Sequence, residues 1–176
     1  MKETDPILRG MNRKDISRVY EIECTCFRSP WSRFSLLKEL SNDLAHYRVM
    51  ELEGKLIGYA GAWIIFEEAH VTNVAIMPEF RNRGYGELLM RDLMRVSMEH
   101  GATCMTLEVR EKNYTAQRLY AKLGFRQNGF RPKYYEDSGE GAILMWNMDI
   151  RSSIGDGPLQ TDHGCDTMHS VWRTQE

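Results

Sequence analysis

Residues 81–86, Arg-Asn-Arg-Gly-Tyr-Gly, combine residue types that could bind a phosphate group. They follow an apolar, strand-like run and precede a helix-like run. A turn at a helix N-terminus presents unpaired backbone N–H groups and the positive end of the helix dipole. Arg81 and Arg83 add positive charge, and glycines let the backbone approach a ligand. The alternative is that Gly84 and Gly86 only permit a tight turn.

Two common nucleotide-binding motifs do not fit this turn. A P-loop has Lys followed by Ser or Thr after its last glycine, whereas Gly86 is followed by Glu87 and Leu88. A dinucleotide-binding motif has a further glycine where this chain has Leu89. The remaining pattern is R-x-x-G-x-G between a strand and a helix, and its expected ligand is a phosphate or pyrophosphate.

The hydrophobic pattern indicates that this turn belongs to an α/β domain. Strands are predicted at residues 46–54, 55–66, 69–78, 103–110, 125–135 and 142–150. Helices are predicted within 15–44, where Pro30 ends one helix and Ser32 caps the next, and at 85–100 and 113–124. Strand and helix alternate in the middle of the chain, which favours a mixed sheet with crossover helices.

The composition is typical of one globular domain. The 176 residues are 42% hydrophobic and carry a net charge of −2, which gives no indication of a general affinity for nucleic acid. No apolar run reaches the length of about 18 residues that a membrane span needs, and residues 1–10 lack a secretory signal. We therefore expect a cytoplasmic protein. Residues 1–150 are assigned to the domain, and residues 151–176, which are polar and without periodicity, to a disordered tail.

The four cysteines indicate free thiols rather than a disulfide framework. Cys24 and Cys26 lie one residue apart, which does not match the two-residue gap of a redox or zinc pair. His163, Cys165 and His169 lie in the tail without a second cluster that would complete a site. No metal is expected.

Two long stretches resemble the GNAT (GCN5-related N-acetyltransferase) superfamily. Residues 71–94, VTNVAIMPEFRNRGYGELLMRDLM, resemble its acetyl-CoA-binding motif, and residues 107–125, LEVREKNYTAQRLYAKLGF, resemble the segment that follows. With PWS at 30–32 and KYY at 133–135, the chain is most similar to the ribosomal-protein-alanine N-acetyltransferase (RimI) type. The resemblance covers about residues 6–150. It implies a mixed, mostly antiparallel sheet of about six to seven strands with about four helices, and acetyl-CoA in a cleft between splayed central strands.

This resemblance also implies where acetyl-CoA binds. The backbone of 81–86 would hold the pyrophosphate, and the strand edge at 74–76 would pair with the pantetheine amides. A bulge in that strand would direct an N–H group to the thioester oxygen. Asn113 would contact the cofactor, cap a helix, or do both. The cofactor-binding residues are then Val74, Ala75, Ile76, Arg81, Asn82, Arg83, Gly84, Tyr85, Gly86, Glu87 and Asn113.

Glu108 and Tyr120 are the residues that the resemblance assigns to proton transfer. Strand alternation places Glu108 on the face opposite to Leu107 and Val109, and without the resemblance it would be read as a solvated side chain. As a base it needs a raised pKa or a bridging water. Tyr120 would return a proton to the sulfur, because a phenol of pKa about 10 can donate to a thiolate when it is held close. The alternative for Tyr120 is a core tyrosine.

Four further residues are candidates near the substrate. His70, at the start of the central strand, is a secondary candidate base, with a structural role as the alternative. Trp31, Tyr134 and Tyr135 are expected at the peptide entrance, where aromatic side chains also pack.

The leading hypothesis is an enzyme that acetylates the N-terminal amine of a protein, by resemblance the alanine of a small-subunit ribosomal protein. Its partner would be the N-terminal segment of that substrate, without nucleic acid or membrane, and the enzyme would be a monomer or weak dimer. One alternative acceptor is a polyamine, an amino sugar or a lysine side chain, for which the acids of residues 136–140 could serve; a solvated hairpin tip is the simpler reading. A different class is a non-catalytic acetyl-CoA-binding module, against which the presence of Glu108 and Tyr120 counts.

Overall fold

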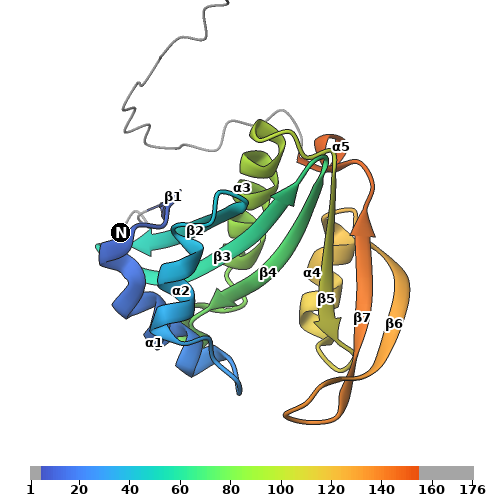
Figure 1. Ribbon diagram of the computed structural model, residues 1–176, viewed down its shortest axis with the longest axis horizontal. Coiled ribbons are helices and arrows are strands. Elements are labelled where there is room, and N and C mark those ends of the chain that lie inside the picture. Colours follow the sequence, from blue (N-terminus) through green and yellow to red (C-terminus); the bar gives the residue numbers. More distant parts are fainter. Residues whose placement is uncertain (1–4, 155–176) are drawn as a thin grey trace, which may run out of the picture.

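A seven-stranded sheet with the order β1-β2-β3-β4-β5-β7-β6 forms the centre of the computed structural model, which describes residues 5–154 (Figure 1). Its strands are β1 Ile7–Gly10, β2 Ala45–Leu52, β3 Lys55–Ile65, β4 Glu68–Ile76, β5 Cys104–Arg110, β6 Arg126–Tyr135 and β7 Glu140–Asn147. Neighbouring strands are antiparallel except for β4 and β5, which are parallel. The prediction of a mixed, mostly antiparallel sheet is confirmed.

The helices are α1 Ile16–Cys26, α2 Arg33–Glu39, α3 Tyr85–Glu99, α4 Tyr114–Lys122 and α5 Ile150–Ile154, with short 3-10 turns at Arg13–Asp15 and Pro78–Phe80. Two predicted caps are confirmed. The backbone N–H of Ser35 donates to Ser32 Oγ at 3.0 Å, and that of Ala116 donates to Asn113 Oδ1 at 3.2 Å. In the described part of the chain no helix is long and apolar enough to cross a membrane.

Helices cover both faces of the sheet (Figure 1). On one face α1 and α2 bury a cluster that includes Val19, Ile22 and Leu36. On the other face α3, α4 and α5 bury a larger cluster that includes Leu93 and Phe125. The sheet is therefore the middle of three layers, and side chains that alternate along a strand enter different cores.

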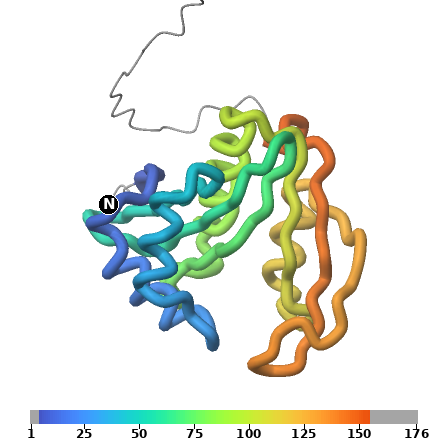
Figure 2. The backbone as a smooth tube through the Cα atoms, in the orientation of Figure 1, coloured from blue at the N-terminus to red at the C-terminus, as the bar shows by residue number. Residues whose placement is uncertain are grey.

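The sheet divides between β4 and β5. These strands pair only at Glu68 with Cys104, Ala69 with Met105 and His70 with Thr106, and then diverge (Figure 2). Beyond this point, residues 71–76 of β4 have no strand partner on the β5 side among residues 5–154. The divergence leaves a free strand edge in the middle of the sheet, as the resemblance implied.

A bulge in β4 lies beside the point of divergence. Gly61 of β3 pairs with Asn73 and Ala62 pairs with Val71, so Thr72 is the extra residue. Residues 74–76, where the bulge was expected, pair regularly with β3. The expected position is therefore corrected to Thr72. A bulge bends its strand, which fits the place where β4 turns away from β5.

Some sequence predictions fall at or beyond the end of the described chain. Residues 155–176, which form most of the predicted tail, lie outside the described residues, as do His163, Cys165 and His169. Helix α5 was not predicted, and its Ile150 is fully buried. Cys24, Cys26 and Cys104 are free thiols, as predicted.

Candidate active site

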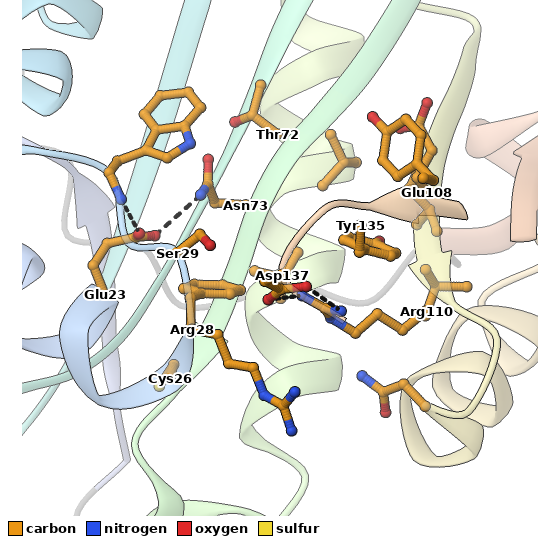
Figure 3. Close-up of a pocket in the computed structure, with 18 of the residues that line it drawn as sticks. Glu23, Cys26, Arg28, Ser29, Thr72, Asn73, Glu108, Arg110, Tyr135 and Asp137 are labelled. Carbon is orange, nitrogen blue, oxygen red and sulfur yellow. Dashed lines mark hydrogen bonds and ion pairs between the residues drawn. The ribbon is translucent and has the colours of Figure 1, made fainter. Parts of the chain in front are cut away.

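A cavity of about 500 Å³ opens between the diverging strands. One wall comes from β4 and the segment between α1 and α2, and the other from β5, α4 and the hairpin of β6 and β7 (Figure 3). The predicted site residues that line it are Trp31, Val74, Glu108, Asn113, Tyr120, Tyr134 and Tyr135. Residues far apart in the sequence thus share one space.

Glu108 projects from β5 into this cavity. Its neighbours Leu107 and Val109 are buried in the core beneath α3 and α4, so alternation along the strand turns Glu108 to the opposite face. The side chain is 27% exposed, and its Oε1 lies 3.6 Å from a guanidinium nitrogen of Arg131. Glu108 is therefore a carboxylate that a substrate in the cavity can reach.

Tyr120 reaches the cavity from α4. Its ring packs against Phe125, with 5.9 Å between the ring centroids. Burial, and to a smaller extent the nearby Tyr135, raises the pKa of Tyr120 above that of an ordinary phenol. No hydrogen-bond partner for its hydroxyl is found between residues 5 and 154, and the residue lines the cavity. The raised pKa favours the protonated phenol, which is the form that a proton donor requires.

The turn before α3 has the backbone conformation of an anion-binding loop. Asn82 and Gly84 have positive φ angles of 62° and 82°, and Gly84 is the N-cap without a side-chain cap. Within the described chain, the N–H groups of residues 82–86 have no acceptor, because the bonds in this region begin with Glu87 donating to the Gly84 carbonyl. A run of free N–H groups at the start of a 15-residue helix is suited to a phosphate.

The charged side chains of this turn are largely held by the protein. Arg81 Nε donates to the Ile76 carbonyl at 2.9 Å. The Arg83 guanidinium lies 5.8 Å from the Phe80 ring centroid. Lys122, followed by Arg91, holds the pKa of Glu87 below its ordinary value. The free backbone N–H groups, rather than Glu87, are thus the groups that could hold an anion.

Among the predicted site residues, His70, Ala75, Ile76 and the whole turn at 81–87 are not part of the cavity lining. His70 Nε2 lies 3.1 Å from Glu68 Oε2, and its ring faces Trp146 where β4 and β5 still pair. Ala75 and Ile76 are buried in the two cores on opposite faces of the sheet. Their contribution to a site would come from the backbone alone.

Glu23 and Asn73 line the cavity but were not predicted. Glu23 is fully buried and accepts hydrogen bonds from Trp31 N at 2.8 Å, Asn73 Nδ2 at 3.0 Å and the Tyr59 hydroxyl. A sequence signal existed, because Glu23 occupies an apolar position of α1, seven residues after the buried Ile16. Asn73 is likewise a polar residue in a buried stretch of β4.

Arg110 binds the acids at the tip of the hairpin. Its guanidinium lies 2.7 Å from Asp137 and 3.7 Å from Glu140, and stacks 3.9 Å from the Tyr135 ring centroid (Figure 3). Two of the three acids in residues 136–140 are thus paired with one cation. Burial raises the pKa of Tyr135 to about 12.

The fold and the cavity correspond to a known class of transferase. The model of the Acetyltransferase (GNAT) family matches residues 16–125, which is more than half of the chain, and the chain belongs to this family. The predicted resemblance is confirmed.

Among its relatives, a Bacillus subtilis protein provisionally named ribosomal protein bS18-alanine N-acetyltransferase is 45% identical over 82% of this chain and 96% of its own. A Haemophilus influenzae protein with the same activity in its name is 35% identical over 79% of this chain and 96% of its own. The crystal structure of the Escherichia coli ribosomal-protein-S18-alanine N-acetyltransferase superposes with a TM-score of 0.75 at 27% identity, covering 81% of this chain and 92% of that one.

Proposed function

We propose that this protein transfers the acetyl group of acetyl-CoA to the N-terminal α-amine of a protein, with the alanine of a small-subunit ribosomal protein as the acceptor. The observation that carries the proposal is the cavity, which brings Glu108 of β5 and Tyr120 of α4 together beside the free edge of β4. The names of the relatives at 45% and 35% identity support the choice of acceptor. A ribosomal substrate also implies a cytoplasmic enzyme.

Acetyl-CoA would supply the acetyl group as a thioester, and the residues present suit its binding. The free N–H groups of residues 82–86 would hold the pyrophosphate. The N–H of Met77 donates to Ile57 of β3 at 2.8 Å, so Ala75 also faces β3 and Val74 faces the free edge. Val74 would therefore pair with the pantetheine amides. Asn113, already an N-cap, lines the same cavity.

Glu108 would accept a proton from the acceptor amine, directly or through a water molecule. An α-amine has a pKa of about 7.7 to 8.0, so a fraction of the substrate is neutral before the base acts. Arg131, at 3.6 Å from Glu108, would orient the carboxylate. Tyr120 would donate its proton to the departing sulfur, because burial keeps its phenol protonated.

The alternative acceptors receive less support from the cavity. A polyamine needs several unpaired acids, but Arg110 neutralises Asp137 and Glu140 in the loop that could supply them. A non-catalytic binding module does not need both an acid and a base at the free strand edge, whereas Glu108 and Tyr120 both line the cavity.

A competition assay tests the proposal. The full chain is given acetyl-CoA with equimolar peptides that begin Ala-Arg, Met-Leu and Ser-Glu, together with spermidine, and products are quantified by mass spectrometry. We expect the alanine-initiated peptide to gain one acetyl group faster than the other acceptors. Faster acetylation of spermidine would overturn the choice of acceptor, and binding of acetyl-CoA without any product would overturn catalysis.

A further inference from the structure

Glu23 and Asn73 form a polar cluster in the cavity wall opposite Glu108 (Figure 3). Glu23 is 0% exposed and Asn73 is 8% exposed. The cluster joins α1 to β4 and has no role in the proton transfers proposed above. Buried polar groups are costly unless they are fully hydrogen-bonded, so each group of this cluster needs a partner.

The side-chain oxygen of Asn73 lacks such a partner. Its Nδ2 donates to Glu23 Oε1 at 3.0 Å, while Oδ1 is buried and has no hydrogen-bond donor within residues 5–154. The opposite orientation of the amide would place Oδ1 against the Glu23 carboxylate, which is repulsive. Glu23 therefore sets the orientation of Asn73, a residue of the cavity lining, and leaves its buried Oδ1 without a donor within residues 5–154.

Glu23 has no positively charged side chain beside it within residues 5–154. Both of its oxygens accept hydrogen bonds, from Tyr59 and Asn73 on one side and from Trp31 on the other, which favours an ionised carboxylate. In the described part of the chain, no Lys, Arg or His lies within ion-pair distance of it. Burial raises the pKa of Glu23, and the hydrogen bonds from Trp31 and Asn73 oppose this effect in part. A buried carboxylate without a counterion is stabilised by a cationic ligand.

We propose that Asn73 Oδ1 accepts a hydrogen bond from the α-ammonium group of the incoming N-terminus, and that Glu23 is a positioning residue that orients Asn73 and balances the ligand's charge. This inference rests on the proposed function. Asn73 follows the bulge at Thr72 and precedes Val74, which faces the free strand edge. The amine would therefore be held one residue from the expected position of the thioester. Asn73 and Glu23 would therefore favour a peptide with a charged N-terminal amine over a peptide whose N-terminus carries no amine.

A pair of matched peptides tests the inference. One begins with alanine, and in the other a propionyl group replaces the alanine, which removes only the amine. Affinity for each is measured calorimetrically at pH 6.5 with the full chain saturated with coenzyme A. We expect wild type to bind the amine peptide at least about 10-fold more tightly, because a hydrogen bond to a charged group contributes that much.

Variants of the pair separate selection from folding. Asn73→Leu should bring the affinity ratio of the two peptides close to one, Asn73→Ser should lower it, and Glu23→Gln should lower it because the charge is lost. Coenzyme A affinity should remain unchanged in all three. As a matched control, Asn147 is a buried asparagine of β7 that donates to the Leu123 carbonyl at 2.8 Å and does not line the cavity. Asn147→Leu should lower the melting temperature without changing the ratio.

Two results would overturn the inference. The first is a wild type that binds both peptides equally, and the second is an unchanged ratio in Asn73→Leu, Asn73→Ser and Glu23→Gln. If wild type still acetylates the alanine-initiated peptide in either case, the proposed function stands and only the role of Asn73 is wrong. If wild type acetylates no acceptor, the proposed function itself is wrong.

Discussion

Tyr120 and Glu108 reach the same cavity from different elements, and their environments differ. Tyr120 is buried and its pKa is raised, whereas Glu108 is partly exposed and contacts Arg131. A buried phenol that keeps its proton suits an acid, and an accessible carboxylate suits a base. The two residues are therefore expected to respond differently to substitution and to pH.

Tyr120→Phe should lower kcat about 100-fold, because it removes the proton donor and little else. Because burial raises the pKa of Tyr120 above that of an ordinary phenol, its ionisation should not reduce the rate between pH 6 and pH 9. The melting temperature should change little, since the hydroxyl has no partner within residues 5–154. A pH–rate profile with a descending limb near pH 8 that Tyr120→Phe abolishes would contradict this role.

Some residues of the candidate site could be placed from the sequence, and others could not. The alternation of Leu107, Glu108 and Val109 was sufficient to place Glu108 on the opposite face from its neighbours. Glu23 and Asn73 could not be assigned in this way, because their hydrogen bond joins residues 50 positions apart. His70 lies outside the cavity because β4 and β5 still pair at its position, and that register cannot be read from a strand pattern.

At the scale of elements, the N-terminus of α3 depends on backbone conformation rather than on side chains. Gly84 has a φ of 82° and a Cβ added there would meet no atom within 4 Å. Gly101, after the same helix, has a φ of 97° and equally open surroundings. The two glycines thus differ in location but not in local strain.

Gly84→Ala and Gly101→Ala should each lower the free energy of unfolding by about 1 to 2 kcal/mol, because alanine is strained at positive φ. Only Gly84→Ala should also weaken coenzyme A binding, since it shifts the N–H groups of residues 82–86. Thermal unfolding and calorimetry measure both effects. Equal coenzyme A affinities in the two variants would show that this turn does not hold the cofactor.

The elements that the sequence missed are the shortest ones. Strand β1 has four residues and helix α5 has five, which is too few for a hydrophobic period to be recognised. The bulge was expected two to four residues from its observed position at Thr72, because the insertion depends on the pairing of β3 with β4. Longer elements such as α3 and β5 agree with their predictions to within one residue at each end.

At the scale of the whole molecule, α5 packs the last described residues, 150–154, against the core. Ile150 is fully buried, and Arg91 of α3 donates to the Ser153 carbonyl at 2.9 Å. Asn147 Nδ2 also donates to Ser153 Oγ at 2.8 Å. These contacts include Ser153, which lies beyond the domain boundary that we predict at residue 150. Shortened chains can therefore test where the domain ends.

A chain ending at Ile154 should keep the melting temperature and the acetylation rate of the full chain, because all contacts of α5 remain. A chain ending at Asp149 should lose about 2 kcal/mol or more of unfolding free energy, since Ile150 no longer fills the core. Denaturant unfolding of both chains measures the difference. A large loss in the chain ending at Ile154 would show that residues 155–176 contribute to the fold.

The site also joins the two layers of helices across the divided sheet. The α1 and α2 layer contributes Glu23 and Trp31 to the cavity, the α3 and α4 layer contributes Tyr120, and β4 and β5 lie between them. The glycine turn lies at the N-terminus of α3, outside the cavity lining. A substrate amine and the cofactor would therefore approach the free edge of β4 from different sides. If this arrangement holds the acceptor, the protein should acetylate an N-terminal α-amine rather than the ε-amine of a lysine.

The most direct measurement uses one peptide that begins with alanine and contains an internal lysine. The full chain acetylates it with acetyl-CoA, and tandem mass spectrometry locates the product, with Glu108→Gln and Glu111→Gln in parallel. Glu111 directly follows β5, lies outside the cavity lining and accepts a hydrogen bond from Gly141 N at 3.3 Å, and serves as the matched control. We expect one acetyl group on the α-nitrogen, a rate about 100-fold lower in Glu108→Gln and an unchanged rate in Glu111→Gln. Acetylation of the lysine, or equal rates in wild type and Glu108→Gln, would contradict the account.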